Sequence, residues 1–247
     1  MKVYHVVYEP SFKSVDIHFW AKCTLACRAC YTDYETLDFG LFDDPIASIA
    51  GKSPQKPPTR FLSLDEVMRL LKGRAVDRAI FMGTEAALDP DMPALAKALH
   101  QEFHSYNVML TNGLKLADMT DVDEVIFSIK AITSALHREY TGQDNARILE
   151  NFTKIARSGK KIQAETVLIP GLIDAGEVER VARFIAGIDR GITLRIDAYF
   201  PVGDNPWRAA TAAEVEEAAV LARKHLDKIS CLTLDMKRTG EKPLRLF

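Results

Sequence analysis

The sequence has no long apolar run and no excess of charge of either sign. Its 247 residues include 32 lysines and arginines against 34 aspartates and glutamates, a balance that creates no field favouring nucleic acid or an anionic membrane surface. No stretch approaches the length of a membrane span, and the opening residues, interrupted by Pro10, do not resemble a signal peptide. We therefore expect a cytoplasmic protein that binds neither nucleic acid nor a membrane.

Cysteine is also scarce, but three of the four cysteines lie close together, at Cys23, Cys27 and Cys30. A disulfide framework needs pairs of thiols and an oxidising compartment, and three neighbouring thiols leave one over. Thiolates are soft ligands that suit zinc, Cu(I) and iron–sulfur clusters. A structural zinc site needs four closed ligands, and His18 is a candidate for the fourth. The spacing favours an iron–sulfur cubane with one open iron and leaves zinc as the alternative.

No internal repeat, low-complexity tract or linker divides the chain. Hydrophobic residues make up 47% of it, which is enough to bury a sizeable core. Because α/β barrels of this length form one unit, we expect a single domain over residues 1–247.

Segments typical of strands and of helices alternate along the chain. Ser14 to Trp20 alternates polar and apolar residues and is expected to be an inner strand that delivers a cysteine loop over residues 21–31. Other strands are expected at 2–8, 79–82, 107–110, 124–129, 162–169, 192–199 and 229–236, and helices at 63–73, 93–104, 146–157, 175–186 and 212–226. The alternation implies parallel βαβ units with right-handed crossovers. With about six inner strands, it predicts an α/β fold, a partial (β/α)6 TIM-like barrel with its site at the carboxyl ends of the strands.

Residues 32–60 interrupt this alternation. The segment contains four prolines and little helical periodicity, and a loop of this size in a compact domain is usually functional or mobile. Its acidic and aromatic residues could shield the cysteine loop or contact a partner. A solvated insertion is the alternative. The acidic and aromatic residues, together with Tyr31 just before the segment, are Asp33, Tyr34, Glu35, Phe39, Phe42, Asp43 and Asp44.

The spacing C-x3-C-x2-C after a strand resembles the radical S-adenosylmethionine (SAM) superfamily. The resemblance implies a 4Fe-4S cluster whose metal ligands are Cys23, Cys27 and Cys30. In that superfamily the open iron is chelated by the amino and carboxylate groups of SAM. One electron from the cluster then cleaves the sulfonium and gives a 5′-deoxyadenosyl radical, which abstracts hydrogen from an unreactive carbon.

Most of the chain, from about Asp16 to Leu226, is similar to one branch of this superfamily, the activating enzymes of glycyl radical enzymes. The resemblance implies a glycyl radical enzyme as the partner and a flavodoxin or ferredoxin as the electron donor. The positions that carry it are Asp123 to Ala131, His137, Thr141-Gly142, Asn145, Ile148-Leu149, Asn151, Val167 to Asp174 and Tyr199.

Four parts of the cosubstrate site can be carried over from the resemblance. Glu85, in Gly83-Thr84-Glu85-Ala86, would accept hydrogen bonds from the ammonium of SAM, and Lys130 would pair with its carboxylate. Thr111 and Asn112, in Thr111-Asn112-Gly113, would line the same pocket, as would Tyr199. Each of these residues also has a simpler interpretation. Glu85 could be an ordinary loop carboxylate, Lys130 a solvated residue at a strand end, and Asn112-Gly113 a turn.

Three departures from the pyruvate formate-lyase type of activating enzyme bear on the substrate. Ser128 replaces an aspartate, Glu165 an arginine and Phe200 a histidine. Exchanging a cation for a carboxylate is expected to reverse the local potential, so we do not expect the pocket to hold the same group in the same way. The alternative substrate is a small metabolite or another protein side chain. A zinc-stabilised binding protein without redox chemistry is the alternative from another class. Since no further cysteine-rich segment is present, we expect one cluster.

Overall fold

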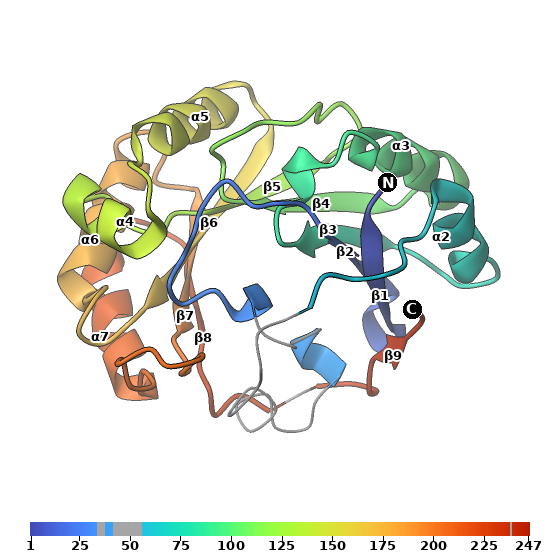
Figure 1. Ribbon diagram of the computed structural model, residues 1–247. Coiled ribbons are helices and arrows are strands. Elements are labelled where there is room, and N and C mark those ends of the chain that lie inside the picture. The colour runs from blue at the N-terminus through green and yellow to red at the C-terminus, as the bar shows by residue number, and fades with distance from the viewer. Residues whose placement is uncertain (34–37, 42–55, 238) are drawn as a thin grey trace.

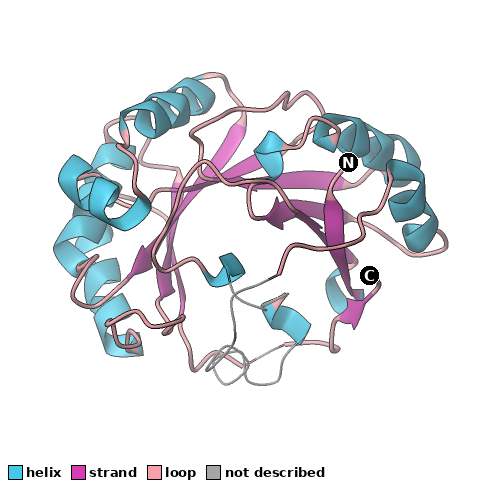
Figure 2. Ribbon diagram, viewed as in Figure 1, coloured by secondary structure: helices cyan, strands magenta, loops and turns pink. Residues whose placement is uncertain are grey.

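The computed structural model of the chain describes residues 1–33, 38–41, 56–237 and 239–247. In this part, one curved sheet forms an open barrel with helices on its outer side (Figures 1 and 2). The nine strands follow the order β8-β7-β6-β5-β4-β3-β2-β1-β9. The sheet does not close on itself, which confirms the predicted partial barrel.

Seven of these strands are parallel, one more than the six inner strands expected. They run from β2 to β8 in chain order, and β1 and β9 are added antiparallel at one edge. The seventh is the segment from residue 229, which is shorter than predicted. The strands are β1 Val3–Glu9, β2 Ser14–Phe19, β3 Arg78–Gly83, β4 Tyr106–Thr111, β5 Glu124–Ser128, β6 Lys161–Leu168, β7 Thr193–Ala198, β8 Ile229–Leu232 and β9 Leu244–Arg245.

The helices cover the outer face of the sheet. The predicted capping boxes at Ser63 and Thr211 are both formed, so these helices begin where expected. The last helix ends at Ala222, short of the predicted Leu226, and α4 was not predicted at all. The helices are α2 Leu64–Leu71, α3 Met92–Phe103, α4 Ser134–Thr141, α5 Ala146–Arg157, α6 Ala175–Ala186 and α7 Ala212–Ala222. No helix in the described residues is long and apolar enough to cross a membrane.

Successive side chains along each strand point to opposite faces of the sheet, one toward the core under the helices and the next into the barrel interior. Phe127 of β5 points outward and meets the ring of Phe152 on α5 edge-on, with centroids 5.3 Å apart. Full burial of such a side chain stabilises the fold by about 2–3 kcal/mol. Ser128, next along β5, therefore faces the opposite side of the sheet, into the barrel. The interior is consequently lined by the second, more polar set of strand residues.

The predicted insertion over residues 32–60 falls mostly outside the described residues, and so do Tyr34, Glu35, Phe42, Asp43 and Asp44. The described pieces include two short 3-10 turns, Tyr31–Asp33 and Phe39–Leu41. Asp38, just before the second turn, is buried, and its carboxylate lies 3.2 Å from Nε2 of His18. This part of the segment therefore packs against the inner face of β2.

Candidate active site

The cysteine loop leaves the carboxyl end of β2 and crosses that end of the barrel, as the blue segment in Figure 1 shows. Cys23, Cys27 and Cys30 are all free and half-buried there. Burial raises the pKa of Cys27 to about 12. Without a bound metal the thiol is protonated, whereas a coordinated metal would remove its proton.

The last turn of α4 holds the middle of the cysteine loop. The N–H of Ala26 donates to the carbonyl of Thr141 at 2.8 Å, and that of Arg28 donates to the carbonyl of Tyr140 at 3.0 Å. The last carbonyls of a helix lack partners within the helix, so α4 and the loop satisfy each other. The unpredicted helix is therefore a main support of the cysteines.

The segment after β7 holds the loop from another side. The Asn205 side-chain amide donates to the carbonyl of Arg28 at 2.6 Å. The guanidinium of Arg28 lies over the ring of Trp207, 4.7 Å from its centroid. Both contacts fix the backbone between Cys27 and Cys30.

Thr84 anchors the start of the cysteine loop. Its hydroxyl accepts from the N–H of Ala21 at 2.8 Å and donates to the carbonyl of Ala21 at 2.7 Å. The preceding Gly83 has φ +108°, and a Cβ there would lie 2.4 Å from the carbonyl oxygen of Phe19. Because it lacks a side chain, Gly83 can lie this close to the backbone of Phe19, and the hydroxyl of Thr84 then reaches Ala21 of the cysteine loop.

The predicted cosubstrate residues at the ends of β3 and β4 come together. The Glu85 carboxylate accepts from the Thr111 hydroxyl at 2.8 Å and from the N–H of Asn112 at 2.9 Å. It is 5% exposed, so it is not a solvated loop carboxylate. Burial raises the pKa of Glu85, although these donors and Lys130 oppose the shift. A buried carboxylate of this kind favours a cationic ligand.

Asn112 also reaches the cysteine loop. Its side-chain amide donates to Sγ of Cys23 at 3.4 Å and to the hydroxyl of Thr24 at 3.2 Å. The following Gly113 has φ +74°, and a Cβ there would meet the ring of Phe127 at 2.2 Å. The Asn-Gly pair is thus a turn, as the simpler interpretation held, and it also connects the carboxylate site with the cysteines.

Lys130 lies just beyond β5, among groups from the cysteine loop and the barrel. Burial opposes its charge, but Tyr140, Cys27 and Glu165 together raise the pKa of Lys130 above its ordinary value. The ammonium is therefore retained near the cysteines, where it could pair with an anionic ligand.

The backbone after Lys130 is fixed by two buried side chains, Glu177, which the sequence did not single out, and Asn145, one of the positions that carry the resemblance. The Glu177 carboxylate accepts from the N–H groups of Ile132 at 2.6 Å and Thr133 at 2.8 Å. The Asn145 amide donates to the carbonyls of Ala131 and Ile132 at 2.9 and 2.7 Å. The only sequence signal for Glu177 was its place three residues after the helix-capping Asp174.

The side chain of Tyr199 contacts the segment that follows it in the chain. It is buried, its hydroxyl accepts from the N–H of Val202 at 3.2 Å, and its ring meets that of Trp207 edge-on. Phe200, the next residue, lies beside Tyr31 with ring centroids 6.4 Å apart. Tyr199 therefore organises the segment that supports the loop, and a direct role toward a cosubstrate stays a prediction.

The departures Ser128 and Glu165 belong to a connected group on the barrel interior. The Ser128 hydroxyl donates to Glu165, and the Arg195 guanidinium donates to Glu165 at 2.5 Å and to Asp197 at 2.8 Å. The expected reversal of potential is therefore partly offset by a cation one strand away. Alternation along β7 could have placed Arg195 on the interior, but its pairing with Glu165 depends on strand register.

Comparison with known proteins identifies the family. The family model described as "Radical SAM superfamily" matches residues 17–185. The chain belongs to the radical SAM superfamily. Radical SAM proteins are enzymes of radical chemistry that generally use SAM and an iron–sulfur cluster, so the chain is an enzyme of this type.

One relative agrees with the activating-enzyme branch, and two solved structures show the fold. A protein of Methanocaldococcus jannaschii, provisionally named a glycyl-radical enzyme activating enzyme, is 30% identical over 183 residues, covering 71% of this chain and 70% of its own. A domain of pyruvate-formate lyase-activating enzyme from Bacteroides vulgatus superposes with a TM-score of 0.52 at 17% identity, covering 62% of this chain and 96% of that domain. A radical SAM methyltransferase from Sphaerobacter thermophilus gives 0.62 at 14% identity, covering 96% and 72%. These two structures share the fold.

The chemistry of the donor set suits an iron–sulfur cluster, because thiolates are its usual ligands. Within the described residues, no group of three or more His, Cys, Asp or Glu side chains is arranged to hold a single metal ion. A cubane instead takes each thiolate on a different iron. His18, the candidate fourth zinc ligand, is buried and bonded to Asp38. The donor set of this loop is therefore three thiols.

Proposed function

We propose that this radical SAM enzyme binds one 4Fe-4S cluster through Cys23, Cys27 and Cys30 and uses SAM as its cosubstrate. The observation that carries the proposal is the link from Glu85 through Asn112 to Cys23, which joins an ammonium acceptor to a cysteine of the loop. When bound, the cluster supplies the electron that cleaves SAM to the 5′-deoxyadenosyl radical.

The chain's own residues bind and orient the cosubstrate. Glu85 accepts from its ammonium, with Thr111 and Asn112 fixing the carboxylate from behind. Lys130 pairs with its carboxylate, and Glu177 holds the backbone that positions Lys130. The supports of the cysteine loop fix the positions of the three thiols, and the site as a whole would have to keep water and stray hydrogen donors away from the reacting carbon.

The proposed hydrogen donor is a backbone glycine in a partner enzyme. The M. jannaschii relative supports this by its name and by the extent of the match. A flavodoxin or ferredoxin would supply the electron, and the whole chain would act as one domain. Each of these assignments rests on the resemblance to the activating enzymes.

The second candidate substrate is a small metabolite or another protein side chain. The observation that favours it is the group of Ser128, Glu165, Arg195 and Asp197 on the barrel interior. An arginine alone at position 165 would present one positive charge. This chain instead presents two carboxylates and a guanidinium, which suits a different ligand.

Deuterium transfer distinguishes the two candidates. A candidate glycyl radical enzyme from the same organism would be prepared with α-deuterated glycine and mixed anaerobically with the reduced enzyme and SAM. We expect deuterium in 5′-deoxyadenosine and a glycyl radical signal by electron paramagnetic resonance. Deuterium that comes from a labelled small molecule in the absence of any partner would replace the glycine with the second candidate.

A further inference from the structure

The sheet register brings the charged interior residues into one row. Ser128 of β5 is opposite Glu165 of β6, Glu165 is opposite Arg195 of β7, and Arg195 is opposite Ser230 of β8. Register partners on neighbouring strands point to the same side of the sheet. We call Ser128, Glu165, Arg195 and Asp197 the interior row.

The interior row is built from short contacts. Both oxygens of Asp197 accept from Arg195, at 2.8 and 2.9 Å, and the second carboxylate in contact with Arg195 is that of Glu165. One guanidinium thus serves two carboxylates, and the three residues carry a net charge of −1 (+1 − 2). Burial above all, and Glu165 to a smaller extent, raises the pKa of Asp197, although Arg195 opposes the shift.

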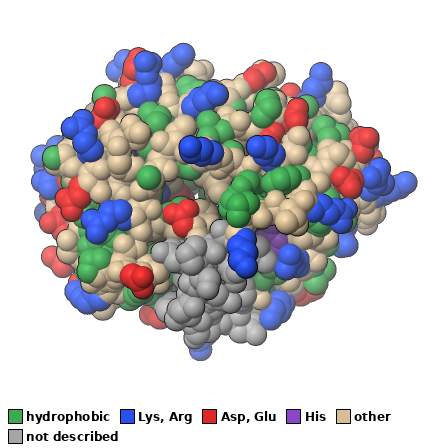
Figure 3. Space-filling view, viewed as in Figure 1, with side chains coloured by type: hydrophobic (Ala, Val, Ile, Leu, Met, Phe, Trp, Pro, Cys, Tyr) green, Lys and Arg blue, Asp and Glu red, His purple; other side chains and the backbone are tan. Residues whose placement is uncertain are grey.

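The row remains open to solvent from the interior. The side chains of Arg195, Glu165 and Asp197 are 35%, 14% and 17% exposed. At the edge of the sheet, Ile229 and Cys231 pack on the core, so Ser230 and Leu232 lie on the interior side, and both are exposed. A ligand can therefore reach these side chains. Acidic and basic side chains are interspersed over the face of the molecule shown in Figure 3.

The row also lies next to the cosubstrate residues without being part of them. Ser128 precedes Lys130 by two residues on the same interior side, and Glu165 lies close enough to raise the pKa of Lys130. The proposed function commits Lys130 to the carboxylate of SAM, so its charge is not available to a second ligand. The charge left for a second ligand is then that of the two carboxylates and Arg195.

We propose that the interior row binds a positively charged hydrogen-bond donor of the substrate, an ammonium or guanidinium group. An anionic ligand would meet a net negative row whose only guanidinium already serves two carboxylates. A cation gains charge-assisted hydrogen bonds from carboxylate lone pairs. The inference rests on the proposed function and names the class of its substrate, which is a basic side chain beside the reacting residue or a free amine.

Matched probes of opposite charge test this inference. The cluster-loaded enzyme with SAM would be titrated with propylammonium and with propionate at equal ionic strength, and binding followed by nuclear magnetic resonance. We expect propylammonium to bind more tightly. Glu165→Gln and Asp197→Asn should each weaken it by about tenfold, the equivalent of one charge-assisted hydrogen bond. Glu150→Gln, which removes a 67% exposed carboxylate on α5, should leave binding unchanged.

A peptide probe distinguishes the two possible sources of the cation, a basic side chain of a peptide and a free amine. The two peptides, Gly-Lys-Gly and Gly-Glu-Gly, are capped with acetyl and amide groups, so that the side chain carries their only charge. If capped Gly-Lys-Gly binds more tightly than propylammonium and capped Gly-Glu-Gly does not bind, the row takes a basic side chain. Equal or weaker binding of capped Gly-Lys-Gly indicates a free amine, and either result supports the inference. Thermal unfolding of each variant verifies that the fold is intact.

Two results would overturn the inference, and neither depends on turnover. The first is propionate binding as tightly as propylammonium, and the second is equal affinities of Glu165→Gln and Glu150→Gln for propylammonium. Formation of 5′-deoxyadenosine is measured on the same samples. If it forms while the charge preference is absent, the inference fails and the proposed function stands. If it does not form with a reduced cluster, the proposed function fails.

Discussion

The side-chain amide of Asn112 donates a hydrogen bond to Sγ of Cys23 across 3.4 Å, while the backbone N–H of Asn112 donates to Glu85. One residue at the end of β4 thus contacts both the cysteine loop and the carboxylate proposed to bind the cosubstrate. A single turn therefore fixes the position of the cysteine loop relative to the carboxylate, so a change at Asn112 should affect both.

Replacing Asn112 by Ala removes the donor to the Cys23 sulfur. Hydrogen bonds to cluster thiolates stabilise the reduced, more negative state, so we expect a more negative reduction potential and slower cleavage of SAM. The measurement is a redox titration followed by electron paramagnetic resonance. Asn205→Ala is the control, because it removes a bond to the same loop without touching a sulfur. Equal potentials for the two variants would contradict the assignment.

Replacing Gly83 by Ala should damage the fold at the start of the cysteine loop. The new Cβ would lie 2.4 Å from a backbone oxygen of Phe19 at φ +108°, and we expect a loss of about 3 kcal/mol or more in the free energy of unfolding. Gly73→Ala is the matched control. It has φ +79° but no atom within 4 Å, so it should cost about 1 kcal/mol. Urea unfolding of both variants tests the difference.

Replacing Glu177 by Gln should loosen the segment that follows Lys130. The side chain is 1% exposed and serves two backbone N–H groups and the Thr133 hydroxyl. A glutamine presents an NH2 group to some of these donors, so we expect a loss of about 2–3 kcal/mol. Glu179→Gln, two residues along on the same helix, removes partly exposed ion pairs and should cost less than about 1 kcal/mol. Equal losses in urea unfolding would show that the buried contacts do not matter.

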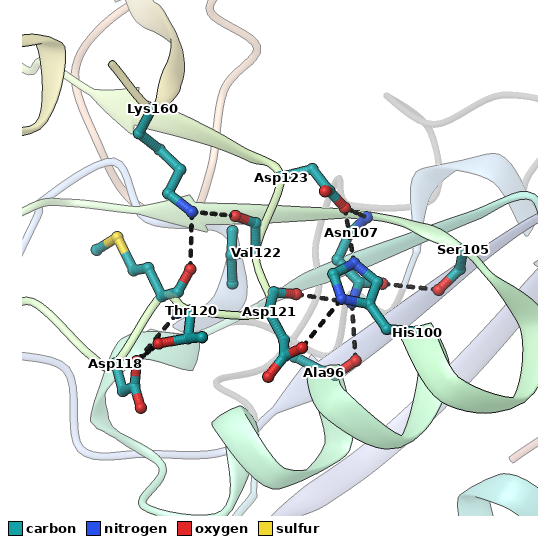
Figure 4. A network of polar contacts seen from close by, with 11 residues as sticks. Ala96, His100, Ser105, Asn107, Asp118, Thr120, Asp121, Val122, Asp123 and Lys160 are labelled. Atoms are coloured by element: carbon teal, nitrogen blue, oxygen red, sulfur yellow. Dashed lines mark hydrogen bonds and ion pairs between the residues drawn. The ribbon is translucent and has the colours of Figure 1, made fainter. Parts of the chain in front are cut away.

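His100 makes stability depend on pH at the far end of the barrel. Its ring lies 3.2 Å from Asp121 and 2.9 Å from Asp123, within the network of Figure 4. Burial opposes the charge, but the two carboxylates raise the pKa of His100 above its ordinary 6.5. The stabilisation is therefore fully present below about pH 6.5 and is lost as pH rises through the folded-state pKa.

The corresponding measurement compares wild type with His100→Asn. We expect the difference in the free energy of unfolding to be largest near pH 6 and to shrink toward pH 9, because the imidazolium is what pairs with the carboxylates. A difference that stays constant or grows over this range would show that the ring acts through packing alone.

Much of the fold could be predicted from periodicity and capping. The capping boxes at Ser63 and Thr211 are local signals carried by residues three positions apart, and both are formed. The helix α4 was missed because its short polar sequence has little apolar periodicity, and contacts with the cysteine loop contribute to its support. Local sequence does not encode such distant partners.

The candidate site likewise combines contacts that could be expected from the sequence with contacts that could not. Glu85, Thr111 and Asn112 follow predicted strands, so their meeting at one edge of the sheet could be expected from the parallel topology, and their contacts are present. The pairing of Arg195 with Glu165 depends on which residues face each other across β6 and β7. That register is set by the packing of the whole sheet, beyond the reach of motif comparison.

The most direct test of the cofactor chemistry is 5′-deoxyadenosine formation by wild type and Cys27→Ala. Both proteins would be reconstituted anaerobically with iron and sulfide, reduced with dithionite and supplied with SAM. We expect the wild type to form 5′-deoxyadenosine and the variant, left with two thiolates on the loop, to form none. A wild-type protein that holds a full, reduced cluster and still leaves SAM intact would contradict the proposed chemistry, and so would equal product from the variant.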